Sequence, residues 1–233
     1  AAGKGIPTDG VVCGYGTIHG RPVYVYGQDF TIAGGSSGQL HNEKVNKIGR
    51  MAVEAGVPLI SLNDSGGGKL NESPDNDNFN FIYQANVAGS GWIPQLSAIM
   101  GPCAGGAAYA PALTDFIFMV EKTSSMFLTG PGVIQEVTGE KVDKETLGGA
   151  STHARRSGMA HFSCADDYAC LEQLKTLLSF LPQNASEKPP RYAVTDDPER
   201  SCPELNDLVP QNARQGFDMH TVIEAIVDDG FFF

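Results

Sequence analysis

Two pairs of glycines follow apolar runs of this chain, and both could stabilise an oxygen that becomes negatively charged. Gly105-Gly106 follows the run at 93–104, and Gly66-Gly67 lies just beyond the run at 57–62. Glycines between a strand and a helix leave backbone N–H groups uncovered, and the helix adds the positive end of its dipole. One N–H from each loop could bind a thioester oxygen and stabilise the enolate that forms. The sequence therefore predicts an oxyanion hole, although glycine pairs after strands also occur as turn or packing residues.

Cys103 offers a second kind of chemistry. It lies at the centre of the segment 101–105, Gly-Pro-Cys-Ala-Gly, which matches a G-x-C-x-G nucleophile-elbow pattern. A cysteine hydrolase also needs a histidine and an acid, and the candidates are His153 or His161 with Asp166. Their spacing does not single them out. We therefore favour the alternative, in which Cys103 is a small buried thiol beside the start of a helix.

Charged side chains elsewhere suggest a phosphate-bearing ligand but no metal. The candidate phosphate contacts are His41, Lys44, Arg155 and Arg156, each of which could equally be a solvated surface residue. The carboxylates expected in turns or helix caps are Asp29, Asp64 and Asp115. His161 and Cys164 have no further ligands at zinc-like spacing, so no metal site is predicted.

The elements around these residues repeat one pattern, an apolar strand followed by a glycine-rich loop and a helix. Residues 11–32 alternate apolar and polar positions and predict a β-hairpin or meander, with turns at 14–16 and 19–20 and with 30–32 continuing its last strand. Further strands are predicted at 57–62, 93–104 and 116–120. Helices are predicted at 39–55, 81–90, 105–113, 131–138, 166–181 and 217–227. Such repeats predict an α/β fold with parallel strands, whose carboxyl ends share one edge of the sheet.

Composition limits the possible partners and compartments. The 233 residues carry a formal net charge of −11, which argues against a nucleic-acid or anionic-membrane partner. The five cysteines are scattered, without a C-x-x-C pair, which favours reduced cytosolic thiols over a disulfide framework. No apolar run approaches the roughly 20 residues that a membrane helix needs. The first and last residues suggest a chain cut at both ends.

Many short motifs, in order along nearly the whole chain, resemble one family, the carboxyltransferase (β) subunits of biotin-dependent acyl-CoA carboxylases. The similarity is greatest to the propionyl-CoA carboxylase type and its actinobacterial relatives. The motifs are Gln28–Thr31, Gly34-Gly35-Ser36 with His41 and Lys44, Asn63–Gly67, Ile93–Gln95, Gly101–Gly106, Pro111–Phe116, Thr129–Pro131, Leu147–Ala150, Thr152-His153 and Ser157-Gly158. The resemblance implies a crotonase-like fold of the Clp protease/crotonase superfamily.

The resemblance also implies an activity. Family members move a carboxyl group from carboxybiotin to the α-carbon of an acyl-CoA, and they need no side-chain base because the freed ureido nitrogen takes the α-proton. The catalytic residues carried over are the oxyanion-stabilising glycines Gly105, Gly106, Gly66 and Gly67. The residues carried over as contacts of coenzyme A are Gly34, Gly35, Ser36, His41, Lys44, Gly130, Gly148 and Gly149.

The resemblance further predicts domains and partners. Residues 1–182 would form the acyl-CoA-binding domain, 183–216 a linker, and 217–233 the start of a second, mostly absent carboxyltransferase domain. No Met-Lys-Met motif for biotinyl-lysine is present, so a biotin carboxylase or biotin carrier partner would bring biotin. A hexameric ring is expected, in the cytoplasm or, for a eukaryote, the mitochondrial matrix.

Some residues depart from the family pattern and leave alternatives open. Lys69 stands where the family usually has arginine, and the segment 68–80 differs throughout, which puts the rim of the pocket in doubt. The four-cysteine zinc ribbon of the bacterial acetyl-CoA type is absent, which favours the propionyl type. The alternatives are a biotin-dependent methylmalonyl-CoA decarboxylase subunit, a thioester hydrolase using Cys103, and a non-catalytic assembly subunit.

Overall fold

The chain divides into two structural units in the computed structural model, Ala1–Pro189 and Pro190–Phe233. The structure describes residues 8–69, 78–212 and 214–233. In the helix that begins at residue 78, side chains are described from residue 83 onward. The predicted division at 182 and 216 stays a prediction.

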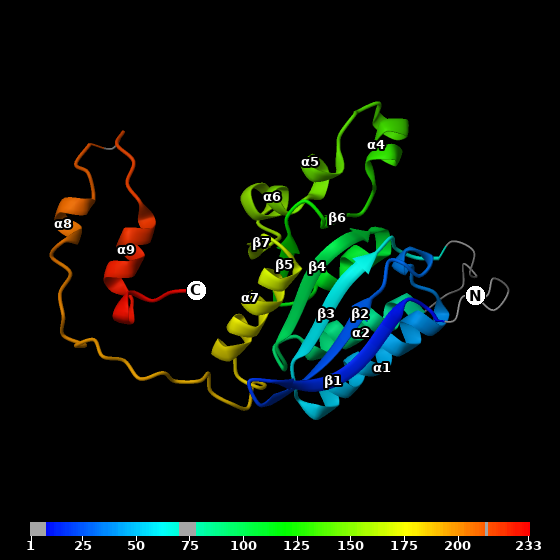
Figure 1. Cartoon of the computed structure of the whole chain (residues 1–233), viewed down its shortest axis with the longest axis horizontal. Coiled ribbons are helices and arrows are strands. Elements are labelled where there is room, and N and C mark those ends of the chain that lie inside the picture. Colours follow the sequence, from blue (N-terminus) through cyan, green and yellow to red (C-terminus); the bar gives the residue numbers. More distant parts are fainter. Residues whose placement is uncertain (1–7, 70–77, 213) are drawn as a thin grey trace. The chain divides into compact units, whose positions relative to one another are not determined.

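The first unit is organised around a seven-stranded sheet (Figure 1). The strands are β1 Val11–Ile18, β2 Arg21–Gln28, β3 Leu59–Ser65, β4 Gln95–Ala104, β5 Phe116–Val120, β6 Ser125–Phe127 and β7 Phe162–Cys164. Their order is β1-β2-β3-β4-β5-β7, and β6 pairs with the end of β4. Among the strands that the structure describes, β1 and β2 pair antiparallel and the other neighbours pair parallel. The predicted α/β architecture with parallel strands is confirmed.

Helices connect these strands close to the predicted positions. Those of the first unit are α1 Gln39–Ala55, α2 Asn78–Gly89, α3 Tyr109–Ala112, α4 Pro131–Thr138, α5 Lys144–Gly148, α6 Ala150–Thr152 and α7 Asp167–Phe180, with short helices η1 Ala33–Gly35, η2 Gly105–Ala108 and η3 His153–Ser157. Gly56 ends α1 at φ 64° and ψ 42°, a left-handed conformation that glycine adopts without steric cost. Asp166 caps α7 by accepting the N–H of Ala169. These signals were readable in the sequence.

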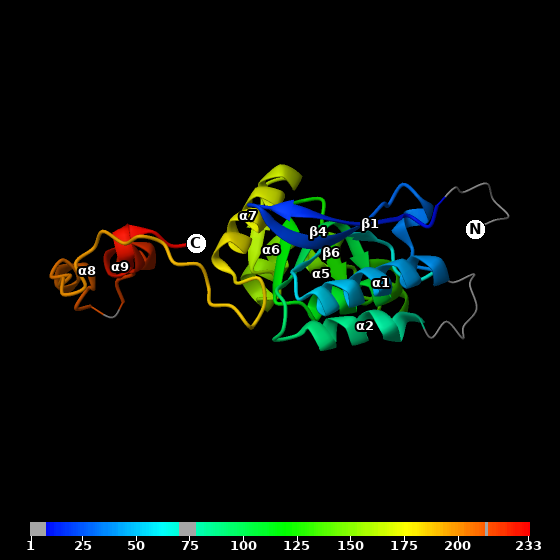
Figure 2. The ribbon, with the colours of Figure 1, turned by 90° about the horizontal axis from the view of Figure 1, so that it is seen from below.

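The sheet has helices on both faces (Figure 2). On one face α7 buries Leu174, Leu177 and Leu178 against a core that includes Leu96 and Phe118. On the other face α1 packs against β1 and β2, and the buried side chains there include Val45, Ile48, Ala52, Tyr26 and Leu59. Each fully buried leucine contributes about 1.5–3 kcal/mol relative to exposure. Two apolar layers thus hold the carboxyl ends of the parallel strands in fixed positions.

Two details of the hairpin differ from the prediction. Gly14 and Gly16 lie inside β1 rather than in a turn, and the turn is at His19-Gly20, where both residues have positive φ. Residues 30–32 do not extend β2, so that expectation was wrong. The carboxylate of Asp29 accepts the N–H of Thr31 at 2.9 Å, and this side-chain turn ends the strand.

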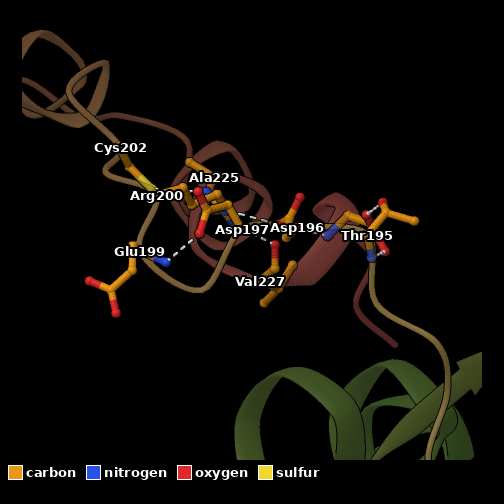
Figure 3. Close-up of polar contacts among 9 residues, drawn as sticks. Thr195, Asp196, Asp197, Glu199, Arg200, Cys202, Ala225 and Val227 are labelled. Atoms are coloured by element: carbon orange, nitrogen blue, oxygen red, sulfur yellow. Dashed lines mark hydrogen bonds and ion pairs between the residues drawn. The ribbon is translucent and has the colours of Figure 1, made fainter.

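The second unit contains α8 Leu205–Leu208, α9 Met219–Ile226 and the short helix η4 Asp228–Gly230. The predicted helix near 217–227 is confirmed as α9. The guanidinium of Arg200 donates to the carbonyl of Ala225 at 2.7 Å and to that of Val227 at 2.9 Å, and it binds Asp196 at 2.8 Å (Figure 3). A cation at the carboxyl end of a helix satisfies carbonyls that lack intrahelical partners. Part of the predicted linker is therefore bound to α9.

Candidate functional site

Three glycine loops meet at the carboxyl end of the parallel sheet. Ser65, the last residue of β3, pairs with Cys103 of β4, so the glycines that follow these two strands are brought together. A Cβ added to Gly67, which has φ 105°, would lie 2.8 Å from the carbonyl oxygen of Ala104. A Cβ on Gly35, with φ 60°, would lie 2.1 Å from the carbonyl oxygen of Asp64. These backbone segments approach so closely that only glycine fits.

The two predicted catalytic loops differ in the acceptors that their N–H groups have within the chain. Gly66 donates its N–H to the carbonyl of Gly34 at 2.9 Å, and Gly67 donates to the Ser65 hydroxyl at 3.2 Å. Both donors are therefore occupied within the chain itself. Gly105 and Gly106 begin η2, and the first N–H groups of a helix have no acceptor within it. Gly66 and Gly67 therefore shape the loop beside Gly105 and Gly106, which lack acceptors within η2 and stay the predicted donors.

Tyr83 binds the Gly106 loop, a contact that no sequence pattern indicated. Its hydroxyl donates to the carbonyl oxygen of Gly106 at 3.0 Å. Its ring packs edge-on against Tyr109, with centroids 5.9 Å apart and planes at 89°. Burial raises the pKa of Tyr83, so the hydroxyl keeps its proton and remains a donor. Tyr83 therefore orients the peptide between Gly106 and Ala107 from α2.

His41 is a buried residue that holds the N-terminal segment against α1. Its side chain is only 1% exposed. One ring nitrogen lies 3.0 Å from the carbonyl oxygen of Asp9, and the other lies 3.3 Å from the amide nitrogen of Gln28. Because the ring is buried and both nitrogens have partners, His41 is poorly placed to contact a phosphate group. Burial is the main reason that the pKa of His41 is lowered, opposed in part by the Asp9 carbonyl. Lys44, in contrast, is exposed and free to reach a ligand.

We expect the pKa of His41 to make stability depend on pH. The pKa of His41 in the folded chain lies below its ordinary value of 6.5, so the unfolded chain binds more protons at pH values between the two. The contribution is complete above about pH 6.5 and is lost as the pH falls toward the folded value. Urea titrations between about pH 7.5 and 5.5 should show the free energy of unfolding falling more steeply for the wild type than for His41→Gln. Equal slopes would contradict the prediction.

The remaining predicted contacts of coenzyme A lie in the neighbouring loops. Gly130 is the N-cap of α4, and the Ser36 hydroxyl donates to the carbonyl of Ala33 at 2.7 Å. A Cβ on Gly148 would lie 2.2 Å from the carbonyl oxygen of Met126, and one on Gly149 would lie 2.1 Å from the Glu145 carboxylate. Close packing against the backbone therefore accounts for Gly148, whereas the exposed Glu145 side chain can move away from Gly149. Their contact with a ligand stays a prediction.

Lys69 stands at the position of the family arginine, but its side chain is bound to Asp9 and does not lie at an open pocket rim. Its ammonium group lies 3.1 Å from the Asp9 carboxylate, and the side chains are only 15% and 7% exposed. Beside this pair, Ser37 and Gly68 form an isolated parallel bridge. The N-terminal segment, α1 and the second glycine loop are thereby joined. Of the altered segment 68–80, residues 70–77 lie outside the described residues.

Cys103 has none of the surroundings of a nucleophile. Its side chain is wholly buried, and burial raises the pKa of the thiol to about 12. The thiol group donates to the carbonyl of Ala107 at 3.3 Å. His153 binds the carbonyl of Met126 at 2.7 Å, and His161 accepts the N–H of Ile117 at 3.0 Å. The candidate residues do not assemble into a triad, which favours the buried-thiol interpretation.

The carboxylates near the strand ends act mostly as caps and turns. Asp115 accepts the N–H of Gln95 at 2.8 Å, and burial raises its pKa. Asp64 lies over Gly101, where an added Cβ would come within 2.1 Å of its carboxylate. Among the residues that the structure describes, no group of three or more His, Cys, Asp or Glu side chains is placed to hold a metal ion. None of the described helices combines the length and the apolar character that crossing a bilayer requires.

A model of the carboxyl transferase domain matches residues 1–233 of this chain. The chain belongs to the carboxyl transferase family. The propionyl-CoA carboxylase carboxyltransferase subunit of Haloferax mediterranei is 49% identical over 229 residues, which are 98% of this chain and 44% of the relative. The methylmalonyl-CoA decarboxylase subunit alpha of Veillonella parvula is 50% identical over 231 residues, which are 99% of this chain and 45% of the relative. The predicted family is confirmed.

Solved structures of carboxyl transferase proteins share the fold. Transcarboxylase 12S, described as a hexamer with hydrolysed methylmalonyl-CoA bound, has a TM-score of 0.90 at 45% identity, covering 99% of this chain and 45% of that chain. The β subunit of geranyl-CoA carboxylase from P. aeruginosa has a TM-score of 0.67 at 27% identity, covering 96% and 42%. The predicted crotonase-like fold class is confirmed. The chain spans less than half the length of these relatives.

Proposed function

We propose that this chain supplies the acyl-CoA-binding site of a biotin-dependent carboxyltransferase. The reaction would move a carboxyl group from carboxybiotin to the α-carbon of propionyl-CoA or a similar acyl-CoA. The observation that carries the proposal is the pair Gly105-Gly106, whose N–H groups lie at the start of η2 without intrahelical acceptors. In the family this position belongs to an oxyanion-stabilising loop, and the relatives named above act on acyl-CoA thioesters.

The Gly105-Gly106 loop is suited to hold the thioester oxygen while negative charge forms on it. Fixed backbone donors stabilise an enolate oxygen more than a neutral carbonyl, so they lower the barrier to removal of the α-proton. Carboxybiotin supplies the carboxyl group, and its freed ureido nitrogen takes the α-proton. Tyr83 is consistent with this mechanism, because its hydroxyl stays protonated and donates a hydrogen bond to the carbonyl of Gly106. The chain thus contributes position and electrostatic stabilisation.

The reverse transfer, from methylmalonyl-CoA to biotin, is the second candidate. The two directions share one enolate, so one site stabilises both. The observation in its favour is that methylmalonyl-CoA decarboxylase subunits from Veillonella parvula and Propionigenium modestum are each 50% identical to this chain. The proposal covers both directions of the same chemistry.

The decisive experiment incubates the full-length protein with methylmalonyl-CoA or malonyl-CoA, with and without free biotin. Loss of the carboxyl group that depends on biotin, leaving propionyl-CoA or acetyl-CoA, would support the proposal and rank the substrates. Release of free coenzyme A regardless of biotin would instead indicate hydrolysis. No reaction with either thioester would favour a non-catalytic assembly subunit.

Replacing Cys103 should leave this activity intact. A wholly buried thiol with a pKa of about 12 has a negligible thiolate fraction at neutral pH. We expect Cys103→Ala to keep the wild-type turnover per folded protein and to lose only about 1 kcal/mol of stability. The assay is the biotin-dependent one above, with urea unfolding in parallel. Abolished turnover in a folded variant would support the thioester hydrolase instead.

Partners and assembly follow from the same family. We propose that biotin arrives on a biotin carboxylase or biotin carrier partner, because the chain has no biotinyl-lysine motif. We also propose a hexameric ring like that of transcarboxylase 12S. The five cysteines are free thiols, which fits the proposed cytoplasmic location.

A further inference from the structure

A small cavity of about 30 Å³ lies behind the Gly106 loop. Gly106, Ala107 and Ala110 form one wall, so the cavity touches the helices that follow the proposed oxyanion donors. Asn42 from α1 and Asn63 from β3 belong to the opposite wall. All these residues lie within the described part of the first unit. The cavity therefore connects α1 to the loop on which the proposed function depends.

Asn42 is the unsatisfied residue of this wall. Its side chain is 0% exposed, and neither its amide nitrogen nor its amide oxygen has a hydrogen-bond partner among the described residues. Its neighbours are occupied: Asn63 donates to the Ser61 hydroxyl at 2.9 Å, and both ring nitrogens of His41 have contacts. Buried side-chain amides are nearly always hydrogen-bonded, to protein or to ordered water. Asn42 thus requires a partner from the cavity.

The size and polarity of the cavity select the partner. The space of about 30 Å³ exceeds the roughly 10–15 Å³ that a water molecule needs in a protein cavity. A buried water needs two to four polar partners. The amide of Asn42 offers both a donor and an acceptor, and Ser37 and Tyr83 also line the space. An apolar molecule would leave the amide unpaired.

We propose that this cavity is an internal water site, that Asn42 is its main protein ligand, and that the water supports the wall formed by Gly106 and Ala107. Asn42 is then a positioning residue, since it acts on the donors only through the water and the loop. This part of the inference rests on the proposed function. The water site itself does not.

Two substitutions of Asn42 separate hydration from packing. Leucine has the branched shape of asparagine but is larger and cannot bind water, so Asn42→Leu should exclude water from the site. Alanine leaves space that a second water can fill, so Asn42→Ala should keep a hydrated cavity. If the water is the partner, Asn42→Ala has the higher melting temperature of the two variants. If Asn42 only fills space, the order is reversed, because alanine leaves a void and leucine does not.

The activity readout uses the biotin-dependent assay on the full-length protein. Because small misplacements of a catalytic group cost rate, we expect Asn42→Leu to lower kcat about tenfold with KM for the acyl-CoA unchanged. Asn42→Ala should retain most of the wild-type kcat. Equal kcat values for the wild type and Asn42→Leu would overturn the positioning role.

Crystal structures of the full-length wild type and of Asn42→Leu complete the test. A water within hydrogen-bond distance of the Asn42 amide in the wild type, absent from the leucine variant, is the expected result. A dry wild-type cavity would overturn the proposal, even if neither variant folds. If the wild type shows no biotin-dependent activity, the proposed function fails, and the crystal structures and the melting order still decide the water site.

Discussion

Gly106→Pro should lower turnover by about 10²–10³-fold, the usual effect of removing one oxyanion donor. Proline has no N–H, so the substitution deletes one of the two proposed donors at the start of η2. The first turn of a helix accepts proline, because its N–H groups have no intrahelical acceptor. Because Gly105, the residue before the proline, has φ 58°, a urea titration in parallel checks that the variant is folded. The measurement is kcat for biotin-dependent loss of the carboxyl group from methylmalonyl-CoA.

Lys144→Pro is the matched control for this experiment. Lys144 is the exposed first residue of α5, and Asp143 before it already has φ −86° and ψ 166°, which suit a residue preceding proline. This variant loses an N–H of the same kind at a different helix start. We expect its turnover to match the wild type. A Gly106→Pro enzyme as active as the control would disprove the oxyanion assignment.

Gly35→Ala should strongly destabilise the first unit. Gly35 has φ 60°, and an added Cβ would lie 2.1 Å from the carbonyl oxygen of Asp64, a backbone atom that cannot move alone. A left-handed conformation costs a non-glycine residue about 1–2 kcal/mol, and overpacking adds about 1–3 kcal/mol. We expect the free energy of unfolding to fall by the sum of the conformational cost and the overpacking cost. Urea titration of the purified variant measures it.

The neighbouring residue separates these two costs. Gly34 has nearly the same φ, 67°, but the nearest atom to an added Cβ is in the Phe30 ring at 3.9 Å. Gly34→Ala should therefore cost only about 1–2 kcal/mol, from the conformation alone. The difference between the variants reports the close approach of η1 to β3. Equal losses for both would mean that the loops do not meet as described.

The loops that form the site were visible in the sequence because each depends on local signals. Glycines after apolar runs predicted turns at Gly66-Gly67 and Gly105-Gly106, and the repeated pattern predicted parallel strands. Helix ends such as Gly56 and Asp166 were also local, since capping depends on residues within one turn. The end of β2 was missed, because the side-chain turn at Asp29 competes with strand pairing and was not recognised.

What each donor binds was decided by tertiary structure. Gly66 and Gly67 have the same residue type and the same position after a strand as Gly105 and Gly106, yet their N–H groups are donated to Gly34 and Ser65. Sequence patterns cannot show this, because the acceptor of Gly66 comes from a loop about thirty residues away, brought near by the sheet. Sequence patterns likewise cannot show that the Tyr83 hydroxyl donates to the carbonyl of Gly106, because the fold brings these two residues together.

The sequence by itself determined the family, the α/β architecture and the glycine loops, because residue type, spacing and periodicity carry that information directly. Tertiary structure decided the states of the side chains. His41 became a buried link to Asp9, Lys69 became half of a buried ion pair, and Cys103 became an inert thiol. Burial and partner choice arise from residues distant in the chain, and desolvation sets both the charge and the reactivity of such groups.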